Sequence, residues 1–185
     1  INDNNKVEVL YYDALGEKGL ESAGVAFDRT CVQLAYAKEN GDQLNENQPQ
    51  QKQELMLLLK QFEEVKISNS QNEKKRQQLF NCLKAPEVYQ SKNIYTFAGK
   101  YQLTFAEVEQ AFLPIKERIQ KVLEGVNNWL KNNQTQFDRL FLAGGFSHFP
   151  LVQDCINQTL GIKDRDERFD RQFNLENSAY AISYG

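Results

Sequence analysis

The sequence contains few of the residues from which metal centres and disulfide frameworks are built. Histidine occurs once, as His148, and the three cysteines, Cys31, Cys82 and Cys155, lie far apart in the chain. A histidine-rich metal site and a Cys–His zinc cluster are therefore excluded. An odd number of widely spaced cysteines indicates buried free thiols in a reducing compartment, so we expect a cytoplasmic protein.

Long apolar runs and an excess of positive charge are also lacking. The densest apolar stretch, residues 55–59, is far shorter than the roughly 20 residues that a membrane helix needs. The first residues show no secretory signal, which would place a charged segment before an apolar one. The formal net charge is −3, so no basic surface is expected to neutralise nucleic-acid phosphates. We expect neither a membrane nor a nucleic-acid partner.

What the chain does have is enough apolar material for a core, with 41% hydrophobic residues among 185. Apolar spacing predicts a helix over residues 25–38 and an amphipathic helix over residues 55–65, separated by a polar loop or helix entry at residues 42–53. Thr104 and Glu107 form the pattern of a capping box at a helix start. Pro114 suits the first turn of a second helix better than a helix interior.

Short runs of strand-forming residues occur at residues 7–12, 79–83, 94–97, 101–103 and 140–143. Helices are predicted after Pro150, ending at Gly161, and over residues 174–184. Strand and helix signals alternate at both ends, while the middle mixes helices with hairpin-spaced strands. The pattern therefore predicts an α/β domain with an inserted α+β part.

The segment most suggestive of chemistry is the strand at residues 140–143 followed by Gly144 and Gly145 and then by the helix beginning at Pro150. Glycine lacks a Cβ atom, so the main chain here can approach a phosphate or a sugar closely. The N-terminus of the following helix favours an anion. An ordinary tight turn remains the alternative reading of such a glycine pair.

Residues 139–156 resemble the adenosine-site segment of the seventy-kilodalton heat-shock proteins and of actin-fold ATPases. Gly144, Gly145 and Pro150 match the pattern of that segment. Phe146 replaces a serine, and His148 replaces the arginine that packs on the adenine in that family. The resemblance implies that this loop faces a nucleotide, with a smaller and mostly neutral ring at position 148.

Other segments resemble the same family in the same order along the chain. They are residues 21–38, in which Gly24, Phe27 and Asp28 agree; residues 58–70, in which Glu63, Lys66 and Ser70 take the positions that face the adenosine; residues 95–112; and residues 174–185. Residues 95–112 resemble the hairpin and the following helix start of that family. An alternative register uses Ser68 in place of Ser70, and a solvated helix face is the plain alternative for these polar residues.

The resemblance implies a fold class and a division of the chain. The fold would be α/β, the second lobe of an actin-like ATPase (ribonuclease H-like) domain carrying an inserted α+β subdomain. Residues 1–22 and 113–185 would form the sheet-and-helix subdomain. Residues 23–112 would form the insertion, which makes one wall of the nucleotide cleft.

The function implied is the adenosine side of an ATP or ADP site in a heat-shock-type chaperone. The phosphate- and magnesium-binding loops would come from the first lobe, and the chain contains no Gly-rich phosphate cradle of its own. We therefore expect no catalytic or metal-ligating residue here, and Mg²⁺ only in a full-length parent. Implied partners are that first lobe, a co-chaperone or exchange factor, and client polypeptides bound by a separate domain. Two alternatives stay open: a degenerate, non-hydrolysing interaction or exchange module, and another actin-fold enzyme such as a sugar kinase.

Overall fold

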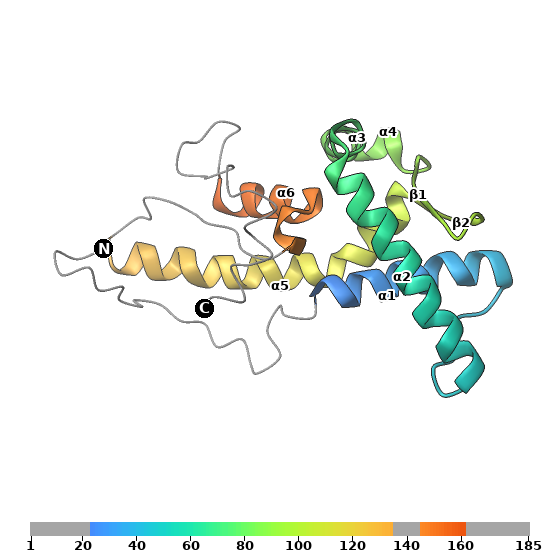
Figure 1. Cartoon of the computed structure of the whole chain (residues 1–185). Coiled ribbons are helices and arrows are strands. Elements are labelled where there is room, and N and C mark those ends of the chain that lie inside the picture. The colour runs from blue at the N-terminus through green and yellow to red at the C-terminus, as the bar shows by residue number, and fades with distance from the viewer. Residues whose placement is uncertain (1–22, 135–144, 162–185) are drawn as a thin grey trace.

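The computed structural model describes residues 23–134 and 145–161, and these residues are mostly helical (Figure 1). Helices make up 77% of them. In chain order the elements are α1 (Ala23–Asn40), α2 (Pro49–Gln71), α3 (Glu73–Lys84), α4 (Pro86–Tyr89), β1 (Asn93–Phe97), β2 (Tyr101–Thr104), α5 (Phe105–Asn132), the 3₁₀ helix η1 (Gly145–His148) and α6 (Pro150–Leu160). The long helix α5 runs along the molecule, with α6 packed beside it and α1 against its first half (Figure 1).

The predicted fold class, an actin-like ATPase (ribonuclease H-like) lobe of α/β type with an inserted α+β subdomain, is wrong. Within the described ranges the sheet has two antiparallel strands, β1 and β2, instead of the multi-stranded sheet of such a lobe. Two of the predicted strands, at residues 7–12 and 140–143, and the predicted helix at residues 174–184 lie outside the described residues. The division at residues 22 and 113 stays a prediction.

The predicted strand at residues 79–83 is also wrong, because this segment belongs to helix α3. Asn72 caps the helix, and its side-chain oxygen accepts a hydrogen bond of 3.1 Å from the backbone N–H of Lys75. Leu79 and Cys82 are buried and lie on one helical face, three residues apart. A five-residue stretch with four apolar side chains fits a strand or a helix face equally well, and here the cap favours the helix.

Pro114 does not begin a second helix, as predicted, but lies inside α5. A proline there removes one backbone hydrogen bond. The buried side chains of α5 continue on both sides of it, from Ala111 and Phe112 to Ile115 and Ile119. Burial of this unbroken apolar stripe outweighs the lost bond, so the helix continues to Asn132.

The predicted helix ends are confirmed where they fall in the described residues. Thr104 and Glu107 form the expected capping box, with a bond of 2.7 Å from the backbone N–H of Thr104 to Glu107 Oε2. Pro150 opens α6, and Gly161 ends it in the left-handed conformation with φ of +63°. The first helix, predicted over residues 25–38, is slightly longer as α1.

The predicted hairpin is confirmed as β1 and β2, with Phe97 paired to Tyr101 across the turn. Gly99 takes a φ of +71°, as a tight turn requires. Alternate residues face the core, so Tyr95, Phe97 and Leu103 are buried while Thr96 is exposed. The hairpin thereby contributes aromatic rings to the interior against α1 and α2.

Phe27 on α1 lies at the centre of an aromatic cluster that joins most of the helices. Its side chain is fully buried, and its ring centroid is 5.0 Å from that of Phe149, 5.7 Å from Phe146 and 6.3 Å from Phe62. Phe112 on α5 meets it edge-on at 6.5 Å. The cluster therefore brings α1, α2, α5, η1 and the start of α6 to one place.

The three cysteines lie in the same interior and are free, as the sequence predicts. Burial raises the pKa of each thiol, so all three stay protonated at neutral pH. A protonated, buried thiol is a poor nucleophile, and these cysteines therefore serve as small apolar side chains.

We expect Phe27→Ala to lower the free energy of unfolding by about 3–5 kcal/mol, because it removes a ring in contact with four others and leaves a cavity. Urea unfolding followed by far-ultraviolet circular dichroism measures this. Leu57→Ala truncates an exposed side chain of α2 and is the control, with an expected change of about 0.5 kcal/mol or less. Equal losses for the two variants would contradict a core centred on Phe27.

Candidate functional site

The candidate site lies where the N-terminus of α1 meets η1 and the C-terminal half of α2. Gly24, in the first turn of α1, packs directly on Phe146 of η1. A Cβ atom added to Gly24 would stand 3.5 Å from Cγ of Phe146, an ordinary van der Waals contact. Residues 122 positions apart in the chain thus meet at this point.

Lys66 on α2 and Asp28 on α1 form a nearly buried ion pair at the same junction. The ammonium Nζ lies 2.6 Å from both carboxylate oxygens, and the two side chains are only 14% and 10% exposed. Burial raises the pKa of Asp28 above its usual value, and the attraction of Lys66 offsets part of this rise. Glu63, one turn earlier on α2, adds a repulsion that also raises the pKa of Asp28.

Phe146 connects this ion pair to the aromatic cluster. Lys66 Nζ lies 5.7 Å from the centroid of the Phe146 ring, within the range of a cation–π contact. On the same side of the cluster, Phe146 stacks on Phe149 with centroids 5.3 Å apart and planes 19° from parallel. Phe146, which stands where the heat-shock pattern has a serine, thus packs on Phe149 and also contacts the Lys66 ammonium through its ring.

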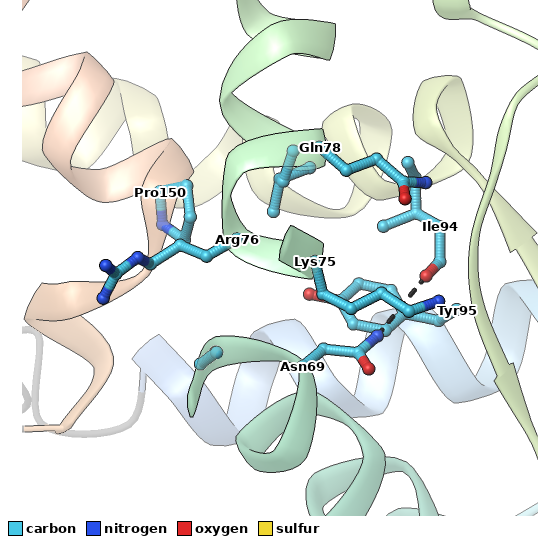
Figure 2. Close-up of a pocket in the computed structure, with 9 residues that line it drawn as sticks. Asn69, Lys75, Arg76, Gln78, Ile94, Tyr95 and Pro150 are labelled. Carbon is cyan, nitrogen blue, oxygen red and sulfur yellow. Dashed lines mark hydrogen bonds between the residues drawn. The ribbon is translucent and has the colours of Figure 1, made fainter. Parts of the chain in front are cut away.

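Ser70 lies one turn beyond Lys66, at the edge of a small hollow between the end of α2, the start of α3, β1 and the start of α6. Its hydroxyl donates to the backbone carbonyl of Lys66 at 2.9 Å and keeps its lone pairs for another donor. Asn69, Lys75, Arg76 and Pro150 border the same hollow. Figure 2 shows the side chain of Lys75 running toward Tyr95 and that of Arg76 running toward Pro150.

The volume of this hollow is about 10 Å³, which is the space of a single water molecule. Pockets for small-molecule ligands are usually about 300 Å³ or larger. The hydroxyl, carboxamide and cationic groups around it suit the polar edge of a nucleoside. A nucleoside fits there only after the side chains of α3 and α6 have moved apart.

A second hollow, of about 460 Å³, opens along α3 and α4 and is wide and shallow. Lys74, Gln77, Asn81, Tyr89 and Lys92 border it. None of the residues that the sequence singled out for a nucleotide lies in its wall.

The sequence-predicted site residues are brought together in part. Gly24, Lys66 and Phe146 meet at one junction, and Ser70 lies on the next turn of α2. Glu63 is exposed on α2 and acts on the junction through its charge. Gly145 begins η1 and His148 ends it, immediately before the N-cap of α6, while Gly144 lies outside the described residues.

Sequence reasoning missed two features of this site. Asp28 was noted as a match to a family segment, but no spacing rule pairs it with Lys66, 38 positions away. Arg76 belongs to a segment that continues directly from α2 through Asn72, and a helix prediction for α3 would have been the signal that places it beside Ser70.

In the described part of the chain, no group of three or more His, Cys, Asp or Glu residues is arranged to hold a metal ion. Nor does any helix of residues 23–134 or 145–161 combine the length and apolar character needed to span a membrane.

No family model matches the chain, and neither the curated proteins nor the solved structures contain a significant match. The function is therefore inferred from the residues of the site and their chemistry.

We expect Asp28→Ala to lower the free energy of unfolding by about 3 kcal/mol, because it leaves the Lys66 ammonium nearly buried without its carboxylate. The double variant Asp28→Leu with Lys66→Met removes both charges, so most of that loss should be restored. Urea unfolding of the two variants and the wild type at neutral pH makes the comparison. If the double variant is as unstable as Asp28→Ala, the unpaired Lys66 charge is not the cause of the lost stability.

Proposed function

We propose that this chain forms the adenosine side of an ATP or ADP site in a heat-shock-type molecular chaperone. The observation that carries the proposal is the meeting of Gly24, Lys66 and Phe146. They come from three separate segments that each resemble a segment of that family, two of them segments that face the adenosine, and all three meet at one junction. Ser70 and Pro150, from two of the same segments, border the hollow beside it.

Each group has a part in this function. Ser70 accepts a hydrogen bond from the nucleoside through its free lone pairs. The main chain at Gly145, which has no Cβ atom, approaches the sugar. Lys66 is held in place by Asp28 and presents its charge at the edge of Phe146. In this proposal, nucleoside binding widens the hollow, because its volume is only about 10 Å³.

Hydrolysis requires donors and a metal around the transferring phosphoryl group. The chain has no Gly-rich phosphate cradle, and in this proposal a first lobe supplies the phosphate and Mg²⁺ contacts. A co-chaperone or exchange factor and client polypeptides, the latter bound by a separate domain, are the proposed partners. The free buried thiols suit a reducing compartment, and we place the protein in the cytoplasm.

A second function, a non-hydrolysing interaction or exchange module, is favoured by a specific observation. The cation of Lys66 is already neutralised by Asp28, and Phe146 is packed on Phe149 instead of lining an open cleft. In this reading the groups that would hold a nucleotide serve to hold the helices together. The two functions differ in one measurable respect, which is whether the protein binds a nucleotide.

Isothermal titration calorimetry of the purified chain with ATP, ADP and adenosine tests this difference. We expect heat of binding for all three ligands, since the proposed contacts are to the adenosine, and no phosphate release from ATP in a parallel assay. Ser70→Tyr, which fills the hollow, should abolish the heat. Glu117→Ala, at an exposed position of α5 outside the hollow, is the control and should bind as the wild type does.

Absence of heat with every nucleotide would overturn the nucleotide site and leave the interaction module as the function. Metal-dependent turnover of ATP by the chain alone would contradict the assignment of catalysis to another lobe.

A further inference from the structure

The charge of the chain is unevenly distributed, and a basic stretch contributes two lysines to the border of the larger hollow. From residue 73 to residue 92 there are five basic and two acidic side chains, a net charge of +3, whereas the whole chain has a net charge of −3. This stretch contains α3 and α4, which pack against each other at the edge of the molecule (Figure 1). A positive region on an acidic protein marks a surface that attracts a partner of opposite charge.

Two lysines border the hollow from different segments. Lys74 lies in the first turn of α3 and Lys92 follows α4, just before β1. Within the described residues the carboxylates that form ion pairs are those of Asp28, Glu46 and Glu107, and their partners are other cations. Lys74 and Lys92 are therefore not neutralised by any of these pairs. Glu73 also borders the hollow, but the two lysines outweigh its charge, so the net charge there is positive.

The rest of the lining is suited to a polypeptide. Gln77, Gln78 and Asn81 present carboxamides, which donate and accept hydrogen bonds as a peptide backbone does. Gln77 and Asn81 bond to each other at 3.1 Å, one turn apart along α3, and each keeps a free donor or acceptor. Tyr89 supplies an aromatic face, over which the ammonium of Lys92 lies at 5.0 Å from the centroid.

We propose that the hollow between α3 and α4 is a docking site for an extended acidic peptide segment of a partner protein. Lys74 and Lys92 pair with carboxylates of the segment, the carboxamides of α3 bond to its backbone, and Tyr89 packs on its side chains. At about 460 Å³ the hollow is in the size range of a ligand site, and its open shape admits a chain that enters and leaves. The site shares Gln78 with the smaller hollow, but the proposal does not depend on the function proposed for that hollow.

An acidic peptide is favoured over a nucleic acid because the basic surface is local. The chain as a whole is acidic, and a long polyanion that extends past the hollow would meet that negative charge. A short peptide segment contacts the basic part alone. The experiment therefore compares the binding of an acidic peptide with the binding of an RNA.

The experiment measures the fluorescence anisotropy of a labelled oligoglutamate peptide titrated with the purified chain at low salt. We expect saturable binding, which weakens by about tenfold or more in the double variant Lys74→Glu with Lys92→Glu, because two attractions become repulsions. Lys121→Glu with Lys131→Glu is the matched control. It makes the same change in net charge at exposed positions of α5, and we expect a loss of about twofold or less.

Tyr89→Ala separates a built site from a general charge effect. It leaves the net charge unchanged but removes both the aromatic face offered to the peptide and the ring beneath the Lys92 ammonium, so we expect a loss of about threefold or more. Three results would overturn the proposal: no peptide binding at low salt, equal weakening by the two charge-reversal pairs, or tighter binding of a labelled oligouridylate RNA than of the peptide. Lys74, Lys121 and Lys131 are exposed, whereas Tyr89 and Lys92 are partly buried, so unchanged circular dichroism and an unchanged midpoint of urea unfolding are the check that each variant is folded.

Discussion

The burial of one aromatic ring, that of Phe27, is the interaction on which the rest of this structure depends. Helix α1 packs on β2 through Tyr36 and Tyr101, and around Phe27 its apolar face contacts rings that come from α2, α5, η1 and the start of α6. Aromatic contacts combine large apolar area with a preferred geometry, so they fix helix positions more tightly than aliphatic contacts of the same area. Phe146 belongs to this cluster, and as a consequence the η1 segment is held against the N-terminus of α1 before any ligand is considered.

The ion pair between Asp28 and Lys66 follows from the same packing. Asp28 is the neighbour of Phe27 in α1, and Lys66 is one turn from Phe62 in α2, so docking the two rings also brings the two charges together. A nearly buried pair of this kind contributes little net stability compared with apolar residues, but it penalises any arrangement in which one partner is left alone. It therefore selects one register of α1 against α2, which is the register that positions the candidate site.

Local signals in the sequence predicted local structure well. The capping box of Thr104 and Glu107, the first-turn Pro150 and the terminal Gly161 each have one favourable backbone use, and each was found there. The failures were of two kinds. At residues 79–83 and at Pro114, tertiary burial and a neighbouring cap decided between conformations that the short pattern left equal. The fold class failed because it was inferred from the alternation of short strand and helix signals and from a resemblance between segments, and neither carries information on how many strands a sheet contains. Of the candidate site, the sequence singles out Gly24, Lys66 and Phe146, but no spacing rule predicts the ion pair of Lys66 with a carboxylate 38 positions away.

Helix α3 has a position that links the two hollows, because Gln78 borders both of them. Helix α3 thus lies between the two hollows, and it is joined to α2 through one residue, Asn72, which ends one helix and caps the next. If α3 shifts when the smaller hollow is filled, the lining of the larger hollow shifts with it. Two ligands that share a movable wall are thermodynamically linked, and each changes the affinity of the protein for the other by the same factor. Helix α3, with its twelve residues, would then couple ligand binding in one hollow to ligand binding in the other.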